Sequence, residues 1–171
     1  MAGYVIHLAV AEEYIKKYPE DIQDYNKFIE GVIAPDGVLD KSITHYGEKS
    51  SKVNLKKFLE SNEVNTDYNK GYFLHLLTDY IFYNKFLEYF SKDIYNDYDI
   101  LNKTLQKTFH VKIPESVKEK VFYKEGKTKI LDLEKTIKFI KQVSRYELND
   151  IKESVLENNI YWREYKNLPR K

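Results

Sequence analysis

The segment GYFLHLLTDYIF, residues 71–82, places a histidine and an aspartate four residues apart in an otherwise apolar and aromatic run. On a helix, residues at this spacing share one face, so His75 and Asp79 can reach a single point beside it. An imidazole and a carboxylate are both ligands for a divalent metal ion. For these two residues alone, a hydrogen-bonded pair in the core is the alternative, because buried polar groups need partners.

Three residues outside this segment could join the pair. His7 lies in the apolar stretch VIHLAV, where an unpaired imidazole would be costly. Asp36 ends GVIAPD, and His45 lies in THYG, within a loop that can direct both side chains inward. Singly, each has a simpler interpretation: a hydrogen-bonded core histidine, a turn residue and an exposed loop histidine. Together they predict a metal site whose residues are His7, Asp36, His45, His75 and Asp79.

A metal ion held in this way could hydrolyse a phosphoester. A divalent ion with one open position lowers the pKa of a bound water to about 7 and polarises a phosphoryl oxygen. In this hypothesis His45, His75 and Asp79 hold the ion, and His7 supports a second ion beside it. Asp36 is either a further ligand or the catalytic general base that orients the attacking water.

The elements that position these residues are expected to be helices. Apolar residues recur every three or four along most of the chain, and only 6 Gly and 4 Pro occur. We therefore expect an all-α fold: one compact domain over residues 1–171, with about seven or eight helices, a metal site between helices and one long loop. The predicted helices cover roughly residues 4–17, 20–33, 53–61, 65–91, 97–109, 114–124, 132–145 and 147–158. Residues 34–51 are predicted to form the long loop, and Gly71 predicts a close approach of another backbone.

Composition excludes several classes of partner and site. The 28 basic and 27 acidic residues give a formal net charge of +1, so no overall field attracts nucleic acid. Cysteine is absent, which leaves nitrogen and oxygen ligands for a metal. No run approaches the roughly 18 apolar residues of a membrane span, and no basic segment opens a signal peptide. We therefore expect a cytoplasmic protein without stable membrane insertion.

Four sequence pieces, in this order, resemble the bacterial zinc-dependent phospholipase C family, helical metallohydrolases typified by secreted phosphatidylcholine-cleaving enzymes. They are IHLAVAE, FIEGVIAPDGV, SITHYG and GYFLHLLTDYIF, and they cover roughly the first half of the chain. The resemblance implies an all-helical fold, a zinc cluster in a cleft and cleavage of a phosphodiester. It also implies that Asp36, His45, His75 and Asp79 surround one zinc, while His7 and a bridging Asp79 serve a second.

The chain departs from the family pattern in two ways. The secreted members complete the second metal shell with further histidines and a glutamate, whereas His110 is the only histidine after Asp79 here. Those members also use the amino group of a processed N-terminus as a ligand, whereas this sequence begins MAG without a signal peptide before it. We therefore expect a reduced relative that binds one or two ions, zinc or another divalent transition metal. Its expected substrate is a small phosphoester or a phospholipid-like molecule.

Two other function classes stay open. A non-catalytic, metal-stabilised helical domain would enclose its ion in closed coordination, whereas a hydrolase needs an open position. A nucleotide phosphohydrolase of the HD type is less favoured, because no adjacent His-Asp pair occurs. In the second half of the chain, Asp93, Asp97 and Asp99 are interpreted as a solvated, helix-capping cluster or as replacement oxygen ligands.

Overall fold

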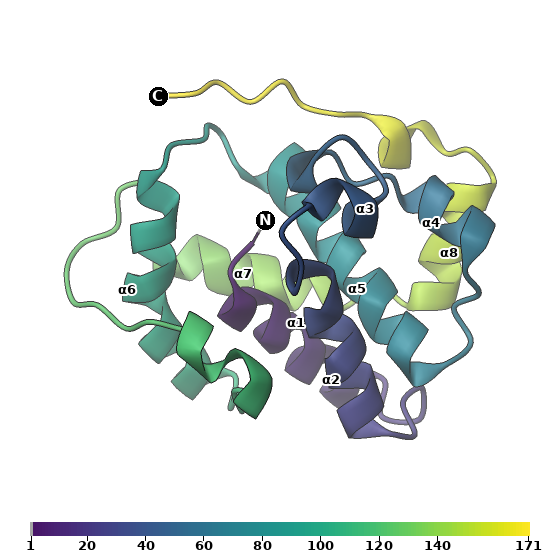
Figure 1. The fold of residues 1–171 in the computed structure, drawn as a ribbon, viewed down its shortest axis with the longest axis horizontal. Helices are drawn as coiled ribbons and strands as arrows, with labels where there is room; N and C mark the ends of the chain where they lie inside the picture. The colour runs from purple at the N-terminus through teal and green to yellow at the C-terminus, as the bar shows by residue number, and fades with distance from the viewer. Residues whose placement is uncertain (1) are drawn as a thin grey trace.

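The computed structural model describes residues 2–171, which fold into helices joined by loops (Figure 1). The α-helices are α1 (Tyr4–Lys17), α2 (Tyr25–Ile33), α3 (Lys41–His45), α4 (Leu55–Ser61), α5 (Asp67–Ile81), α6 (Asp93–Thr108), α7 (Leu133–Val143) and α8 (Leu148–Leu156). The 3-10 turns are η1 (Ala34–Asp36), η2 (Ser50–Lys52), η4 (Glu115–Lys120) and η5 (Ile160–Arg163), and η3 (Phe82–Phe86) is a π-helical turn. Within residues 2–171, extended pairing is limited to an isolated bridge between Phe90 and Arg170. The predicted all-α fold is confirmed.

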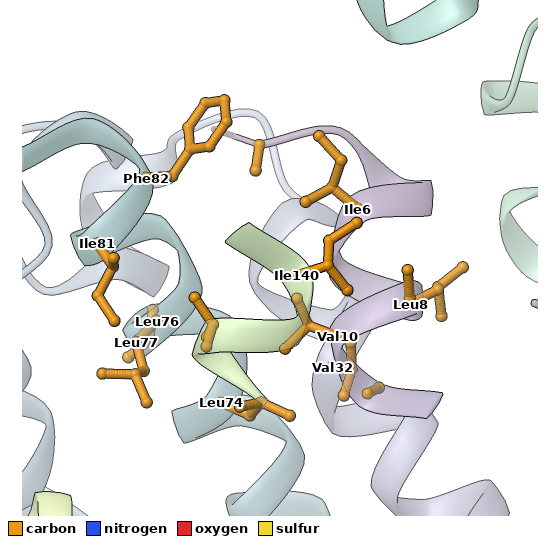
Figure 2. Packing of buried hydrophobic residues seen from close by; sticks show 14 of the residues in the cluster. Ile6, Leu8, Val10, Val32, Leu74, Leu76, Leu77, Ile81, Phe82 and Ile140 are labelled. Atoms are coloured by element: carbon orange, nitrogen blue, oxygen red, sulfur yellow. The ribbon is translucent and has the colours of Figure 1, made fainter. Parts of the chain in front are cut away.

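Helix α1 lies in the core, enclosed by other helices. Every residue from Val5 to Ala11 is buried, and the helix contacts α2, α5, α6 and α7. A helix that is apolar on all sides belongs in such a position. Figure 2 shows Ile6 and Val10 of α1 grouped with Ile140 of α7 and with side chains of α5. This packing fixes His7, which lies on the same helix.

Helices α2 and α5 cross at two glycines. A Cβ atom on Gly71 would lie 2.0 Å from the carbonyl oxygen of Phe28, and one on Gly31 would lie 2.0 Å from the carbonyl oxygen of Tyr68. Only glycine permits this approach, because any side chain would overlap the facing backbone. The predicted close approach at Gly71 is confirmed. His75 follows one turn later and therefore lies against the end of α2.

The first half of the chain differs from prediction at two places. Helix α2 begins at Tyr25 rather than near residue 20, because the Asp24 side chain caps it by accepting a hydrogen bond from the Lys27 amide. The predicted loop 34–51 is not fully irregular, since it contains η1, α3 and the start of η2. The Asp40 side chain caps α3 by accepting the Ser42 amide hydrogen bond.

The long helix expected to reach residue 91 ends earlier. Regular α-helix stops at Ile81, and the π-helical turn that follows stops at Phe86. The Asn84 side chain explains the end: its amide donates to the carbonyl of Tyr80, and its oxygen accepts from the Lys166 amide at 2.9 Å. The hydrogen bond between Asn84 and Lys166, near the C-terminus, thus takes the place of further helical hydrogen bonds. The expected helix 114–124 is also reduced, to the 3-10 turn η4.

The C-terminal segment runs across one side of the helices, beyond α8 (yellow in Figure 1). Trp162 is buried and donates from its indole nitrogen to the Ser154 hydroxyl at 2.9 Å, so it packs this segment onto α8. The Tyr165 hydroxyl donates to the carbonyl of Val53 at 2.8 Å. None of the helices in residues 2–171 has the length and apolarity needed to cross a membrane.

Candidate metal centre

Four of the predicted site residues meet in the core. Asp36 comes from η1, His45 from the end of α3, and His75 and Asp79 from α5. One ligand atom from each lies within 4.8 Å of the other three, and all four residues are buried. This group could hold a metal ion.

The distances between ring nitrogens and carboxylate oxygens fit one ion. Nε2 of His75 lies 3.2 Å from Oδ2 of Asp79 and 3.5 Å from Oδ1 of Asp36. Nε2 of His45 lies 3.0 Å and 3.6 Å from the same two oxygens. Two ligand atoms bonded to one tetrahedral zinc ion lie about 3.4 Å apart, given metal–ligand bonds of about 2.1 Å.

The two histidines face hydrogen-bond acceptors at both ring nitrogens. Nδ1 of His75 lies 2.6 Å from the carbonyl oxygen of Val32, and Nδ1 of His45 lies 3.0 Å from that of Lys41. At Nε2 each ring faces carboxylates. A neutral imidazole carries only one N–H, so it can donate to one side only. When Nδ1 donates to the carbonyl, the Nε2 lone pair faces a carboxylate oxygen, and a proton or a metal ion must lie between them.

Several buried polar atoms of the site have no hydrogen-bond partner in the protein. Nε2 of His75 and both carboxylate oxygens of Asp36 are buried and make no hydrogen bond. Such atoms are rare in folded proteins, because an unpaired buried polar group is costly. His75 and Asp79 lie 3.2 Å apart, as the alternative of a core pair requires, but that pair leaves the orphaned Asp36 oxygens unexplained. The orphaned atoms fit a set of metal ligands.

The electrostatics of the cluster favour a positive charge. Burial lowers the pKa of His75, but the Asp36 and Asp79 carboxylates outweigh this and raise it to about 10. Burial raises the pKa of Asp79, but His7 and His75 hold it well below its usual value. Both carboxylates thus stay ionised in the interior. A metal cation would supply the positive charge that the two carboxylates favour, in place of a proton on His75.

His7 faces Oδ1 of Asp79, whereas His45 and His75 face Oδ2. Its Nε2 is 3.0 Å from Asp79 Oδ1, which also accepts a hydrogen bond from the Ala2 amide at 3.0 Å. The His7 ring stacks on that of His75, with centroids 3.6 Å apart, and neither of its nitrogens is hydrogen-bonded. Burial, followed by the nearby His75, lowers the pKa of His7, so its ring is neutral. His7 therefore touches two members of the group, Asp79 and His75, and a second ion at His7 stays a prediction.

Three side chains that sequence reasoning did not select support the cluster through its backbone. Nζ of Lys41 donates to the carbonyl of Asp36 at 2.5 Å and lies 3.9 Å from its carboxylate. The Tyr4 hydroxyl donates to the same carbonyl at 3.2 Å, and the Tyr72 hydroxyl donates to that of Thr44 at 2.8 Å. Lysine and tyrosine are frequent throughout this chain, so no sequence signal marked these three.

The remaining candidates lie elsewhere. His110 is exposed. Asp97 is fully buried, and its carboxylate accepts hydrogen bonds from the amides of Lys129, Ile130 and Leu131 at 2.7–3.2 Å. The interpretation of Asp97 as a solvated capping residue is therefore wrong. Its carboxylate oxygens instead accept hydrogen bonds from the loop before α7.

A pocket of about 420 Å³ lies beside the cluster, and Asp36 is among the residues that line it. Tyr4, Tyr98, Asn102 and Phe122 contribute to the walls. Among the four residues of the group, Asp36 is the one that lines this pocket, and both its carboxylate oxygens are buried.

Comparison of the chain with protein-family models, with characterised proteins and with solved structures finds no match.

Proposed function

We propose that the protein is a metal-dependent hydrolase, a phosphoesterase that resembles zinc-dependent phospholipase C. The observation that carries the proposal is the double position of Asp36, which belongs to the buried ligand group and also lines a pocket. A closed structural site has no need of such a pocket, whereas a catalytic site must admit a substrate beside its metal.

The residues would divide the work as follows. His45, His75 and Asp79 hold the ion, with zinc preferred because the donors are nitrogen and oxygen at tetrahedral spacing. A bound zinc supplies a Lewis acid that polarises a phosphoryl oxygen and makes water acidic near neutral pH. The carbonyls of Val32 and Lys41 keep the two rings oriented by accepting from Nδ1.

Asp36 would act as the general base. Its Oδ1 lies with the ring nitrogens, while Oδ2 has no hydrogen-bond donor and can take the proton of an attacking water. Burial raises the pKa of Asp36, but His75 outweighs this and lowers it, so Asp36 is present as the carboxylate, the form that a general base needs.

A second candidate is a metal-stabilised helical domain without catalytic activity. The burial of the group favours it: Asp36 is 4% exposed and His75 1%, while His45 and Asp79 are 0% exposed. Four protein ligands fill a tetrahedral shell, as structural zinc sites do. The two candidates share the metal and differ in whether Asp36 leaves a position open.

Elemental analysis of protein purified without a histidine tag or added metal tests the shared premise. We expect one or two equivalents of zinc or a similar ion in the parent. His75→Ala and Asp79→Asn should lose it, while His110→Ala, which removes an exposed histidine, should retain it. A metal-free parent that takes up no zinc on titration would rule out both candidates.

Hydrolysis assays then separate the two candidates. The zinc-loaded parent should cleave bis(4-nitrophenyl) phosphate or 4-nitrophenyl phosphate, with activity lost on chelation and restored by zinc. Asp36→Asn should lower the rate by about 10²-fold or more, in line with the contribution of a general base. A parent that binds zinc and cleaves neither ester at any zinc loading would favour the structural candidate.

A further inference from the structure

A second pocket, of about 370 Å³, is lined by five cationic side chains, and we call it the basic pocket. Its cations are Lys49, Lys52, Lys92, Lys166 and Arg170. We infer that the basic pocket binds a phosphate group. Taken with the proposed hydrolase function, on which this step rests, the substrate carries a phosphate in addition to the ester that is cleaved.

The positive charge of the basic pocket is not neutralised by the protein. No carboxylate lines it, and none of its five cations forms an ion pair within residues 2–171. Two carboxylates next to it in sequence are already paired: Asp93 lies 3.5 Å from Lys129, and Glu164 lies 3.4 Å from Lys85. Lys166 Nζ donates to the carbonyl of Leu87 at 2.5 Å, but none of the five cations has a carboxylate partner, so in a chain whose net charge is +1 they form a strong local field for an anion.

The cations come from three segments that the fold joins at this place. They lie at residues 49–52, at Lys92 and in the C-terminal segment. The Phe90 amide donates to the carbonyl of Pro169 at 2.8 Å, and the Lys171 amide donates to that of Phe90 at 3.0 Å, which fixes two of these segments together. The Arg170 guanidinium lies 5.1 Å from the centre of the Phe90 ring. The backbone that carries Arg170 is therefore held against Phe90, which lowers the entropic cost of binding an anion there.

The chemistry of the lining matches a phosphate. Lysine and arginine are the usual donors to phosphate oxygens, and charge-assisted hydrogen bonds are about twice as strong as neutral ones. Tyr83, which is 3% exposed, also lines the pocket and can donate from its hydroxyl.

The basic pocket is a neighbour of the pocket that reaches Asp36. Tyr95 lines both, so one ligand can extend past its ring from one to the other. An anion bound among the lysines is thus placed to anchor a substrate whose ester lies beside Asp36. Binding energy from such a remote group positions the reacting part of a substrate.

Calorimetric titration with pyrophosphate tests the inference directly. The titration uses the full chain with a chelator and, separately, with zinc. We expect binding in both conditions, weakened by about tenfold or more in Lys52→Gln/Lys92→Gln and by added salt. The control Lys107→Gln/Lys138→Gln removes the same charge from two exposed lysines outside the pocket and should bind like the parent.

Four outcomes would decide whether the basic pocket binds phosphate. Equal affinity in the two double variants, or no binding to the parent, overturns the inference. Binding that requires zinc and ignores Lys52 and Lys92 also overturns it, because the anion then binds at the metal centre, and the proposed function survives. Lysine-dependent binding in a chain that takes up no metal supports the phosphate site and removes the hydrolase.

A vesicle arm identifies the source of the phosphate. Phosphatidylcholine vesicles with and without phosphatidic acid are sedimented with the parent and both double variants. Binding to phosphatidic acid that depends on Lys52 and Lys92 supports a lipid phosphate, while pyrophosphate binding without vesicle binding supports a soluble one. Lysine-independent behaviour in both arms counts against the site.

Discussion

Asp36 and Asp79, the two carboxylates of the candidate metal centre, differ in the hydrogen bonds that they make within the protein. Asp79 Oδ1 accepts a hydrogen bond from the Ala2 amide, and its Oδ2 lies 3.0 Å from the nearest ring nitrogen of His45. Asp36 makes no side-chain hydrogen bond although it is buried. Loss of the Asp36 charge should therefore be felt in metal binding more than in folding.

At the residue scale we predict a thermal-shift result for Asp36→Asn. With chelator, the variant should melt slightly below the parent, because the Asp36 carboxylate, whose pKa is lowered beside His75, stabilises the folded state modestly. With zinc at a hundredfold excess over its Kd, the parent should gain about 2.7 kcal/mol, or roughly 5–10 °C, and the variant clearly less. A variant that melts far below the parent in chelator would show that Asp36 serves folding itself.

At the scale of elements, the crossing of α2 and α5 couples packing to the metal centre. Both helices carry glycine at the contact, and His75 follows Gly71 by one turn while its Nδ1 lies 2.6 Å from the carbonyl oxygen of Val32. The ring orientation therefore depends on how closely the helices approach.

Gly71→Ala should break this crossing. The new Cβ atom would lie 2.0 Å from the Phe28 carbonyl oxygen and 2.9 Å from the Val32 amide nitrogen, so the helices must separate. We expect a loss of about 2–4 kcal/mol in urea unfolding, far above the roughly 1 kcal/mol that alanine adds in helix propensity. Gly37→Ala is the control, because a Cβ atom there would lie 3.4 Å from the carbonyl oxygen of Ala34, and it should change stability by less than about 1 kcal/mol. Equal stability of the two variants would contradict the close backbone contact of α2 and α5 at Gly71.

A second element-scale coupling joins α6 to the loop before α7. The buried Asp97 carboxylate accepts three backbone amides, from Lys129, Ile130 and Leu131. A charged acceptor shared by three donors can fix an otherwise irregular loop, since hydrogen bonds to charged groups contribute about 1.5–3 kcal/mol.

Asp97→Asn should release this loop. We expect the free energy of unfolding to fall by about 2–3 kcal/mol and the amides of residues 129–131 to exchange hydrogen faster. Exchange in α1 should change only as far as the global stability changes. Asp99→Asn is the matched control, because Asp99 makes only a partly exposed ion pair with Lys124 at 3.5 Å. Unchanged exchange in the loop after Asp97→Asn would show that the carboxylate is not what holds it.

At the scale of the whole molecule, local signals were predictable and long-range ones were not. The bounds of α1, Tyr4–Lys17, agree with the prediction, because a dense apolar pattern ends just before Pro19. The meeting of Asp36, His45, His75 and Asp79 was predicted because few histidines occur and each interrupts or flanks an apolar segment.

The rest depends on partners distant in sequence. The carbonyls that accept from the two histidines carry no sequence signal, since every residue has one. The end of the helix after α5 depends on Asn84, whose partner Lys166 is 82 residues away. Asp97 resembled a surface acid because its amide donors lie 32–34 residues later.

Removal of the Tyr165 hydroxyl should let the C-terminal segment detach from the helices more often. The Tyr165 hydroxyl donates to the carbonyl of Val53, and the same segment brings Lys166 and Arg170 to the basic pocket. Tyr165→Phe removes about 1 kcal/mol of local stability, so the open population should rise about fivefold. Limited trypsin digestion, followed by mass spectrometry, should show cleavage after Lys166 accelerated by that factor, because cleavage of a rapidly reclosing segment follows its open population. Tyr68→Phe, at a 38% exposed tyrosine outside this segment, should digest like the parent, and equal rates in both variants would mean that other contacts hold the segment.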